Sequence, residues 1–472
     1  MAYKTTRRRL RAACLVGLVA GCGTSPSSSN DAGAVNPDAG GVTDAGTQDA
    51  GADAGHAVNV CGAASGTVAW TASISAATTS LVPTGVTAGP TNDVVVGDIS
   101  NAVTFEQHRW NSSGALLSSH QDNQGSYAGT MFPSNLVLDS QNDVFYGLVR
   151  TGMPQGSNSG ASLTFSSLAP DGTTVFTNTQ VNALPTASGQ PSVAVFQAGA
   201  DTGGNLHATL TMGAPKYFAP AVYCWGGDGT DIGPSAQTVA TTLTASDFLW
   251  PSLDASLYLA EALTTSTNFG CGVLPVPAGG ATVLGKFNGG GGCLWTKLLA
   301  LPTAAIKQRA FRQGEDGSLS LAVVYSGTID FGGGPLESSG TSSLALARFD
   351  SAGTLLWTKN FGGAGSSFNL GSLDTNAAGV CILTAQYGGS VDLGGGLLPT
   401  SADTFLAVFD PAGTLKWSKV VTVGTSGQLL AAVGPCGLVL TTDSPAVDLG
   451  TGPLSTGSGT SSATIGVAAL GL

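Results

Sequence analysis

Histidines are few in this sequence, which limits the reactions that it can be expected to catalyse. Three of the four, His108, His120 and His207, lie beyond residue 60, and none has a cysteine or second histidine at the spacing of a zinc site. No G-x-S-x-G motif provides a serine nucleophile. From residue types alone we predict no catalytic residue, no metal site and no cofactor.

Aspartates and one tryptophan remain as candidate binding residues. Asp330, Asp392 and Asp448 recur at the same place in near-identical segments, and a residue needed in every repeat is expected to be structural. Trp250 lies outside the repeat frame and is our weak candidate for stacking on a ligand. The tryptophans at repeat positions are expected in the core.

Six cysteines follow residue 22, and an exported chain can oxidise them. They are Cys61, Cys224, Cys271, Cys293, Cys381 and Cys436. Six cysteines allow about fifteen pairings, so the sequence leaves the connectivity open. The candidate disulfide joins Cys271 and Cys293, because these two flank one expected strand.

The N-terminus has the pattern of an export signal. A basic start precedes a short apolar run, Ala12–Ala20, which is too short to cross a bilayer. The following "VAGC" resembles the bacterial lipobox, which implies cleavage before Cys22 and lipid attachment to that cysteine. Gly23 after it implies sorting to the outer membrane, facing the periplasm or the surface. The alternative is an ordinary secretory signal.

A low-complexity segment separates this signal from the rest of the chain. Asp-Ala-Gly occurs five times in residues 22–60, with too little apolar surface to offset the entropy of ordering. We therefore predict a signal peptide over residues 1–21, a disordered tether over 22–60 and one folded domain over 61–472. A flexible tether of this length spans roughly 35 Å.

Composition favours an all-β domain. The chain has 69 glycines and only 10% charged residues, and beyond the N-terminus it shows no sustained helical periodicity. Five of the 17 basic residues precede Cys22, which leaves 12 against 29 acidic residues. Such an acidic protein is a poor partner for nucleic acid. We expect a monomer whose membrane contact is the lipid anchor.

A repeat of about 60 residues organises the folded domain. "FDSAGTLLWTK" from Phe349 returns as "FDPAGTLKWSK" from Phe409, each with a glycine between bulky apolar residues. This glycine is expected to supply the positive φ of a tight hairpin turn. Its equivalents are Gly66, Gly114, Gly172, Gly229, Gly291, Gly353 and Gly413.

A second marker recurs with the same period, and the chain ends complete the pattern. The segments "IDFGGGPL", "VDLGGGLL" and "VDLGTGPL" begin at Ile329, Val391 and Val447. Earlier equivalents are taken as Phe105, Phe165, Phe218 and Phe269. The N-terminal "SGTVAW" is a fourth strand without a third, and the C-terminal "SATIGVAALGL" is a third without a fourth. We therefore predict a seven-bladed β-propeller closed by pairing of N-terminal and C-terminal strands.

These units resemble a known family, the β-propeller repeat of secreted bacterial proteins, and also NHL-type blades. "DTFLAVFDPAG" from Asp403 and "LDTNAAGV" from Leu373 carry the likeness. The repeat is also similar to the tryptophan-docking repeat of quinoprotein propellers, although the interval from Asp350 to Gly353 is one residue short for it.

The sequence leaves three hypotheses about function. Long connections between second and third strands should emerge on one face, which makes that face the candidate binding surface, unless the loops are simple linkers. The preferred hypothesis is a non-enzymatic scaffold that binds a protein or glycan there. The alternatives are a propeller enzyme, either a hydrolase or lyase or a quinoprotein relative, and a structural envelope lipoprotein.

Overall fold

The computed structural model describes the chain from residue 59 onward, in segments. These are 59–76, 81–100, 104–123, 131–139, 141–150, 162–181, 192–200, 206–213, 221–225, 248–251, 256–288, 292–300, 305–314, 316–400, 403–423, 429–444, 447–449, 454 and 463–472. The predicted signal peptide, Cys22 and nearly all of the tether lie outside the described residues. Within these segments no helix has the length and apolarity needed to cross a membrane.

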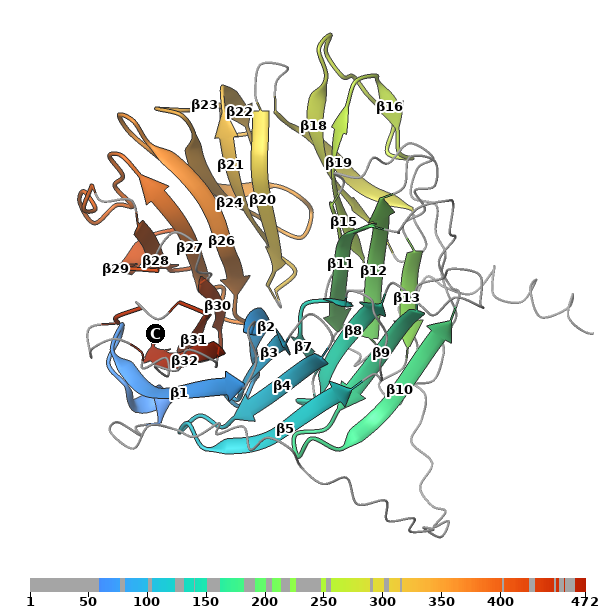
Figure 1. The fold of residues 1–472 in the computed structure, drawn as a ribbon. Helices are drawn as coiled ribbons and strands as arrows, with labels where there is room; N and C mark the ends of the chain where they lie inside the picture. Colours follow the sequence, from blue (N-terminus) through green and yellow to red (C-terminus); the bar gives the residue numbers. More distant parts are fainter. Residues whose placement is uncertain are drawn as a thin grey trace, which may run out of the picture. The chain divides into compact units, whose positions relative to one another are not determined.

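Strands make up most of the described residues and form seven main antiparallel sheets, which we number in chain order (Figure 1). Sheet 1 contains β2 (Leu81–Ala88), β3 (Val94–Ser100), β4 (Thr104–Trp110) and β5 (Leu116–Asn123). Sheet 2 contains β6 (Met131–Pro133), β7 (Val137–Leu138), β8 (Val144–Arg150), β9 (Ser162–Leu168) and β10 (Thr174–Val181). Sheet 3 contains β11 (Ser192–Ala200), β12 (Leu206–Gly213) and β13 (Ala221–Trp225).

Sheets 4 to 7 follow the same up-and-down order. Sheet 4 contains β14 (Phe248–Pro251), β15 (Leu257–Leu263), β18 (Ala281–Phe287) and β19 (Cys293–Ala300), extended by β22 (Thr328–Asp330) and β23 (Pro335–Glu337). Sheet 5 contains β20 (Ala305–Gln313), β21 (Leu319–Ser326), β24 (Ser343–Phe349) and β25 (Leu355–Phe361). Sheet 6 contains β26 (Ser367–Thr375), β27 (Cys381–Gly388), β28 (Asp403–Phe409) and β29 (Leu415–Val421). Sheet 7 contains β30 (Leu429–Val433), β31 (Gly437–Thr442), β32 (Ala463–Gly471) and β1 (Val68–Ala76).

Two short elements lie outside this scheme. The hairpin of β16 (Thr267–Asn268) and β17 (Val273–Leu274) projects from the connection between the second and third strands of sheet 4. A 3₁₀ turn, η1 (Val60–Gly62), precedes β1. The succession of four-stranded antiparallel sheets is β-propeller-like and confirms the all-β prediction.

The repeated glycine closes the last hairpin of sheets 1, 2, 5 and 6, as predicted. Gly353 and Gly413 both have φ of 80°, and Gly66, Gly114 and Gly172 lie in the same left-handed region. The preceding aspartate fixes the turn, because Asp350 Oδ1 accepts hydrogen bonds from the backbone of Ala352 and Thr354. Gly229 and Gly291 lie outside the described residues.

At four of the described boundaries, a tryptophan from the last strand of one sheet packs on the glycine of the next sheet. A Cβ atom added to Gly413 would lie 2.7 Å from Cδ2 of Trp357, and one added to Gly353 would lie 2.7 Å from Cε2 of Trp295. Trp357 Nε1 also donates to the carbonyl of Pro411, 2.9 Å away, within the same turn. The same contact joins Trp70 to Gly114 and Trp417 to Gly66.

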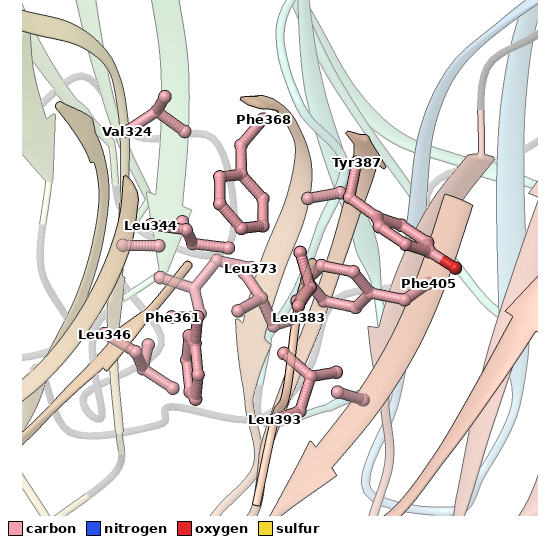
Figure 2. Packing of buried hydrophobic residues seen from close by; sticks show 14 of the residues in the cluster. Val324, Leu344, Leu346, Phe361, Phe368, Leu373, Leu383, Tyr387, Leu393 and Phe405 are labelled. Carbon is pink, nitrogen blue, oxygen red and sulfur yellow. The ribbon is translucent and has the colours of Figure 1, made fainter. Parts of the chain in front are cut away.

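The second marker fills the space between sheets. Ile329 and Phe331 belong to a buried cluster that joins sheets 4 and 5. Val391 and Leu393 occupy the same place between sheets 5 and 6, where Figure 2 shows the apolar side chains meeting. Asp330 and Asp392 each accept two backbone hydrogen bonds from the glycines that follow them, which is a structural role.

The earlier equivalents of this marker were assigned wrongly at two positions. Phe105 lies within β4 and Phe165 within β9, so both belong to third strands and not to the connection before them. In sheet 1 the physical reason is the short connection between β3 and β4, which leaves no room for a hairpin. In sheet 2 the connection, residues 151–161, lies outside the described residues. Phe269 does lie in the second-to-third connection of sheet 4, and Phe218 falls outside the described residues.

The two ends of the described chain share one sheet. β1 pairs antiparallel with β32 from Val68 opposite Leu470 to Ala76 opposite Ala463, so the blue and red strands lie side by side in Figure 1. A disulfide between Cys61 and Cys436 joins the segment before β1 to the turn between β30 and β31. Its sequence separation is 375 residues, and no spacing pattern predicted it.

Gly413→Ala tests the tryptophan contact. Left-handed backbone costs an alanine about 1–2 kcal/mol, and here the new methyl group must also displace Trp357. We expect a larger loss of unfolding free energy, measured in urea, than for Gly365→Ala, where φ is 67° and nothing lies within 4 Å of the added Cβ. Equal losses in the two variants would show that the indole contact contributes nothing.

Removing the Cys61–Cys436 disulfide should destabilise the domain more than removing Cys271–Cys293. The two bonds close sequence separations of 375 and 22 residues, and loop-closure entropy makes the difference roughly 2.5 kcal/mol. The double alanine variants, compared by urea unfolding, check this. A smaller effect for the long loop would contradict the expectation.

Candidate functional site

A pocket of about 270 Å³ opens between sheets 6 and 7. It lies where β26, β28 and β30 begin and β27 ends, which is also where the long connection from β27 to β28 leaves sheet 6. Its lining consists of Asn369, Leu370, Gly371, Gln386, Thr404, Leu429 and Leu430.

Strand register places three polar side chains of this lining in one row. Asn369 on β26 lies opposite Gln386 on β27, which in turn lies opposite Thr404 on β28. Directly opposed residues of antiparallel strands point to the same face, with Cβ atoms about 5 Å apart. Two primary amides and one hydroxyl therefore project side by side toward sheet 7.

The amides are held in place from the sheet 5 side. Asn369 Nδ2 donates to Gln386 Oε1 at 3.2 Å, and Asn369 Oδ1 accepts from the side-chain amide of Gln308 on β20. Gln308 Oε1 in turn accepts from the backbone of Leu370 at 2.6 Å. Because Gln386 Oε1 is engaged by Asn369, its Nε2 group is left as the donor for a further hydrogen bond.

A bulge in β26 shapes the inner wall of the pocket. The register shifts between Leu370 and Leu373, and Ser372 fills the gap by accepting from Ala431 of β30 at 3.0 Å and contacting Thr384 Oγ1 at 2.9 Å. A Cβ atom on Gly371 would collide with Thr384 Oγ1. The glycine is therefore required for the wall to approach β27 closely.

The acidic neighbour of the pocket is already engaged. Asp403 precedes Thr404, and its Oδ1 accepts from the backbone of Thr404 and of Val423. Its Oδ2 accepts from the hydroxyl of Thr422 at 2.8 Å. The Thr404 hydroxyl makes no hydrogen bond to other described residues and is nearly buried, at 3% exposure. The pocket wall therefore offers neutral hydrogen-bonding groups and not a charge.

The opposite ends of these strands are tied from sheet to sheet. Arg348 of sheet 5 donates to the carbonyl of Gly379 in sheet 6, and Asn376 of sheet 6 donates to Gly434 in sheet 7 at 2.9 Å. Arg109 of sheet 1 likewise donates to Asn142 in sheet 2 at 2.8 Å. The short-turn end is therefore closed by inter-sheet bonds, whereas the pocket lies at the long-loop end.

The sequence-predicted candidates do not converge on the pocket. Trp250 lies on β14, and its side chain falls outside the described part of the structure. Cys271 and Cys293 are joined by a disulfide with a Cα–Cα distance of 5.5 Å, in sheet 4. The long connections of sheets 5, 6 and 7 begin as buried wedges between sheets, so much of their length has a structural role.

His108 belongs to a second polar cluster, between sheets 1 and 7. Its Nε2 lies 3.5 Å from Asp98 and 3.7 Å from Glu106, and its Nδ1 lies 2.9 Å from Ser119 Oγ. Serine, histidine and a carboxylate are also the residue types of a catalytic triad with a serine nucleophile. Burial by itself lowers the pKa of His108, but the contacts with Asp98 and Glu106 outweigh it and raise the pKa to about 9. At neutral pH the imidazole is therefore charged and cannot accept a proton from Ser119.

Sequence reasoning missed the pocket residues. Asn369 and Gln386 occur in ordinary strand segments, and only the register across β26, β27 and β28 brings them together with Thr404. The one available signal was the place where apolar alternation gives way to polar residues at the strand ends.

No family model and no curated protein matches this chain. Among solved structures, an ulvan lyase of polysaccharide lyase family PL25 is 9% identical with a TM-score of 0.43, covering 85% of this chain and 93% of that chain. Polysaccharide lyase Uly1 is 9% identical with a TM-score of 0.41, covering 83% and 90%. Prolyl oligopeptidase B from Galerina marginata is 10% identical with a TM-score of 0.40, covering 77% and 47%. Likenesses at this level carry no argument about activity.

The charge of His108 predicts how stability depends on pH. Because its pKa rises from 6.5 to about 9 on folding, its contribution is complete below about pH 6.5 and is lost as the pH rises through 9. We expect a loss of roughly 2–3 kcal/mol between pH 6.5 and 9.5. Thermal unfolding of wild type and His108→Gln across this range checks it, since the variant should show a flatter decline. Parallel declines would contradict the assignment.

Proposed function

We propose that the seven sheets are the blades of one closed β-propeller. Sheet 7, which combines β1 with the last three strands, contacts sheet 1 through β2 and sheet 6 through β26. Apolar clusters join sheet 7 to sheet 1 and sheets 4, 5, 6 and 7 in succession. Closure of the ring by the two chain ends removes exposed sheet edges, which is the physical advantage of this arrangement.

We infer the subcellular location from the sequence. The lipobox-like "VAGC" supports a bacterial outer-membrane lipoprotein anchored through Cys22, with the segment up to residue 60 as its tether. Lipid at that cysteine would hold the domain near the membrane without a spanning segment. The NHL-like and bacterial propeller repeat resemblance remains a prediction, because no family model matches.

The function of this anchored domain is the non-enzymatic binding of a small uncharged polar ligand at its long-loop end. The observation that carries this is the row of Asn369, Gln386 and Thr404 beside the apolar side chain of Leu429 in the pocket. Pockets that combine apolar walls with a few convergent polar groups are the default binding sites of folded proteins. None of the seven lining residues has a side chain that titrates near neutral pH, so the lining supplies no general acid or base.

The enzyme alternative, a hydrolase or lyase or a quinoprotein relative, has one observation in its favour. Two carboxylates and a histidine do meet, at Asp98, Glu106 and His108, but they are 0%, 4% and 1% exposed and lie between sheets. A structural envelope lipoprotein without a ligand is the other alternative. The pocket argues for the binding hypothesis over both.

Ligand-observed NMR on the full-length protein tests the proposal. The probes are glycerol, acetamide and methyl glucoside, which are uncharged, against acetate, phosphate and ethylamine. We expect saturation transfer to at least one uncharged probe and its loss in the double variant Gln386→Leu, Thr404→Val. The control is Thr358→Val, which removes a buried hydroxyl without a hydrogen-bond partner and remote from the pocket. Binding of none of the uncharged probes, or binding that the double variant leaves intact, would refute the proposal.

A further inference from the structure

The hydrogen-bonding groups of the pocket are matched to hydroxyl groups. An amide and a hydroxyl side chain each offer donors and acceptors, as a sugar hydroxyl does. Gln386 presents its Nε2 donor, because Asn369 engages its Oε1. Thr404 presents a hydroxyl that no other described residue engages, on the strand directly opposite. Two such groups about 5 Å apart at their Cβ atoms can reach different hydroxyls of one ring.

The floor of the pocket suits the carbon skeleton of such a ring. Leu429 of sheet 7 supplies the apolar side chain, because it belongs to the buried cluster between sheets 6 and 7. Leu370 packs toward sheet 5, and strand alternation turns Leu430 away from the pocket, so these two line it only through their backbone side. A sugar ring carries its hydroxyls at the edge and C–H groups on its faces, so a ligand with a polar edge and an apolar face fits both parts of the lining. A simple amide or alcohol would leave one part without a partner.

Size limits the ligand to one ring. The volume of about 270 Å³ lies just below the range of roughly 300–1,000 Å³ that holds drug-sized molecules. A chain of several sugars would have to extend beyond the pocket, with only one residue inside it. A free monosaccharide and the end of a glycan present the same chemistry to these residues.

Charge selects against acidic sugars. The lining holds no cation to neutralise a carboxylate or phosphate, and the nearby carboxylate of Asp403 is held by Thr404, Thr422 and Val423. The formal charge of the chain, −12, adds long-range repulsion of anions. An uncompensated anion in this pocket would lose its hydration without gaining a partner.

We propose that the pocket between sheets 6 and 7 recognises a single neutral sugar ring, through Gln386 and Thr404 at its hydroxyl edge and Leu429 at its face. This rests on the proposed binding function and narrows it to one ligand class. It names Gln386 and Thr404 as the residues that determine specificity.

Titration of the full-length protein with methyl glycosides tests this. The probes are the methyl glycosides of glucose, galactose and mannose, each paired with its uronic acid where the carboxylate replaces the primary hydroxyl. We expect at least one neutral glycoside to bind and its uronic acid to bind at least tenfold more weakly. Gln386→Leu and Thr404→Val should each weaken binding about five- to tenfold, the effect of one neutral hydrogen bond. Thr358→Val should leave it unchanged.

Disaccharides separate the two sources of the ring. If a disaccharide binds as tightly as the methyl glycoside only when the preferred sugar is at its non-reducing end, the ligand is a glycan terminus. If every disaccharide is excluded and the monosaccharide binds, the ligand is a free sugar. Both results support the inference.

Three results would overturn it, and they are distinguishable. If glycerol or acetamide binds in a Gln386-dependent manner while every neutral glycoside fails, the sugar assignment is wrong and the binding function stands. If a uronic acid binds as tightly as its neutral parent, charge selection is wrong. Failure of every probe at millimolar concentration removes the binding function as well.

Discussion

The contact between an indole and the glycine of the next sheet sets the geometry of this domain. Trp357 against Gly413 and Trp295 against Gly353 are copies of one arrangement, in which a left-handed turn without a Cβ lets the ring lie flat on the backbone. At Gly353 and Gly413 one sheet therefore positions its successor by a contact that leaves no room for a Cβ atom. In sheet 1 the tryptophan is replaced by Ser118, whose hydroxyl still donates to the carbonyl of Pro170 two residues before Gly172, so the hydrogen bond persists where the ring is lost.

The hydrogen bonds between neighbouring sheets follow from the same geometry. The first strand of each sheet is an edge, and its outward N–H groups need partners. Side chains from the preceding sheet supply them: Gln308 for Leu370, Ser372 for Ala431 and Asp374 for Val433. Asn135 does the same for Ala198 between sheets 2 and 3. These bonds fix the relative height of neighbouring sheets, and the pocket occupies the end of the sheet 6–7 boundary beyond the last of them.

Periodic features were predictable from the sequence, and the features made by register were not. The turns at Gly353 and Gly413 and the pairing of β1 with β32 could be predicted, because a repeated pattern and two incomplete units each leave a local trace. The pocket left only polar residues at the strand ends, since Asn369 and Thr404 meet through the pairing of three strands and a bulge between Leu370 and Leu373. His108 was visible as a residue, but its buried acidic partners Asp98 and Glu106 depend on the alignment of β3 with β4. The disulfide of Cys61 with Cys436 depends on the whole fold.

The composite make-up of sheet 7 also constrains the order of events during biosynthesis. β1 is made first among the strands described, yet its partner β32 is made last, after every intervening sheet. Until then β1 carries a row of unsatisfied amides and an apolar face that includes Trp70 and Ile74. A ribosome that has released every strand up to β31 would therefore leave β1 unpaired, exposed to proteases and to other chains until β32 follows.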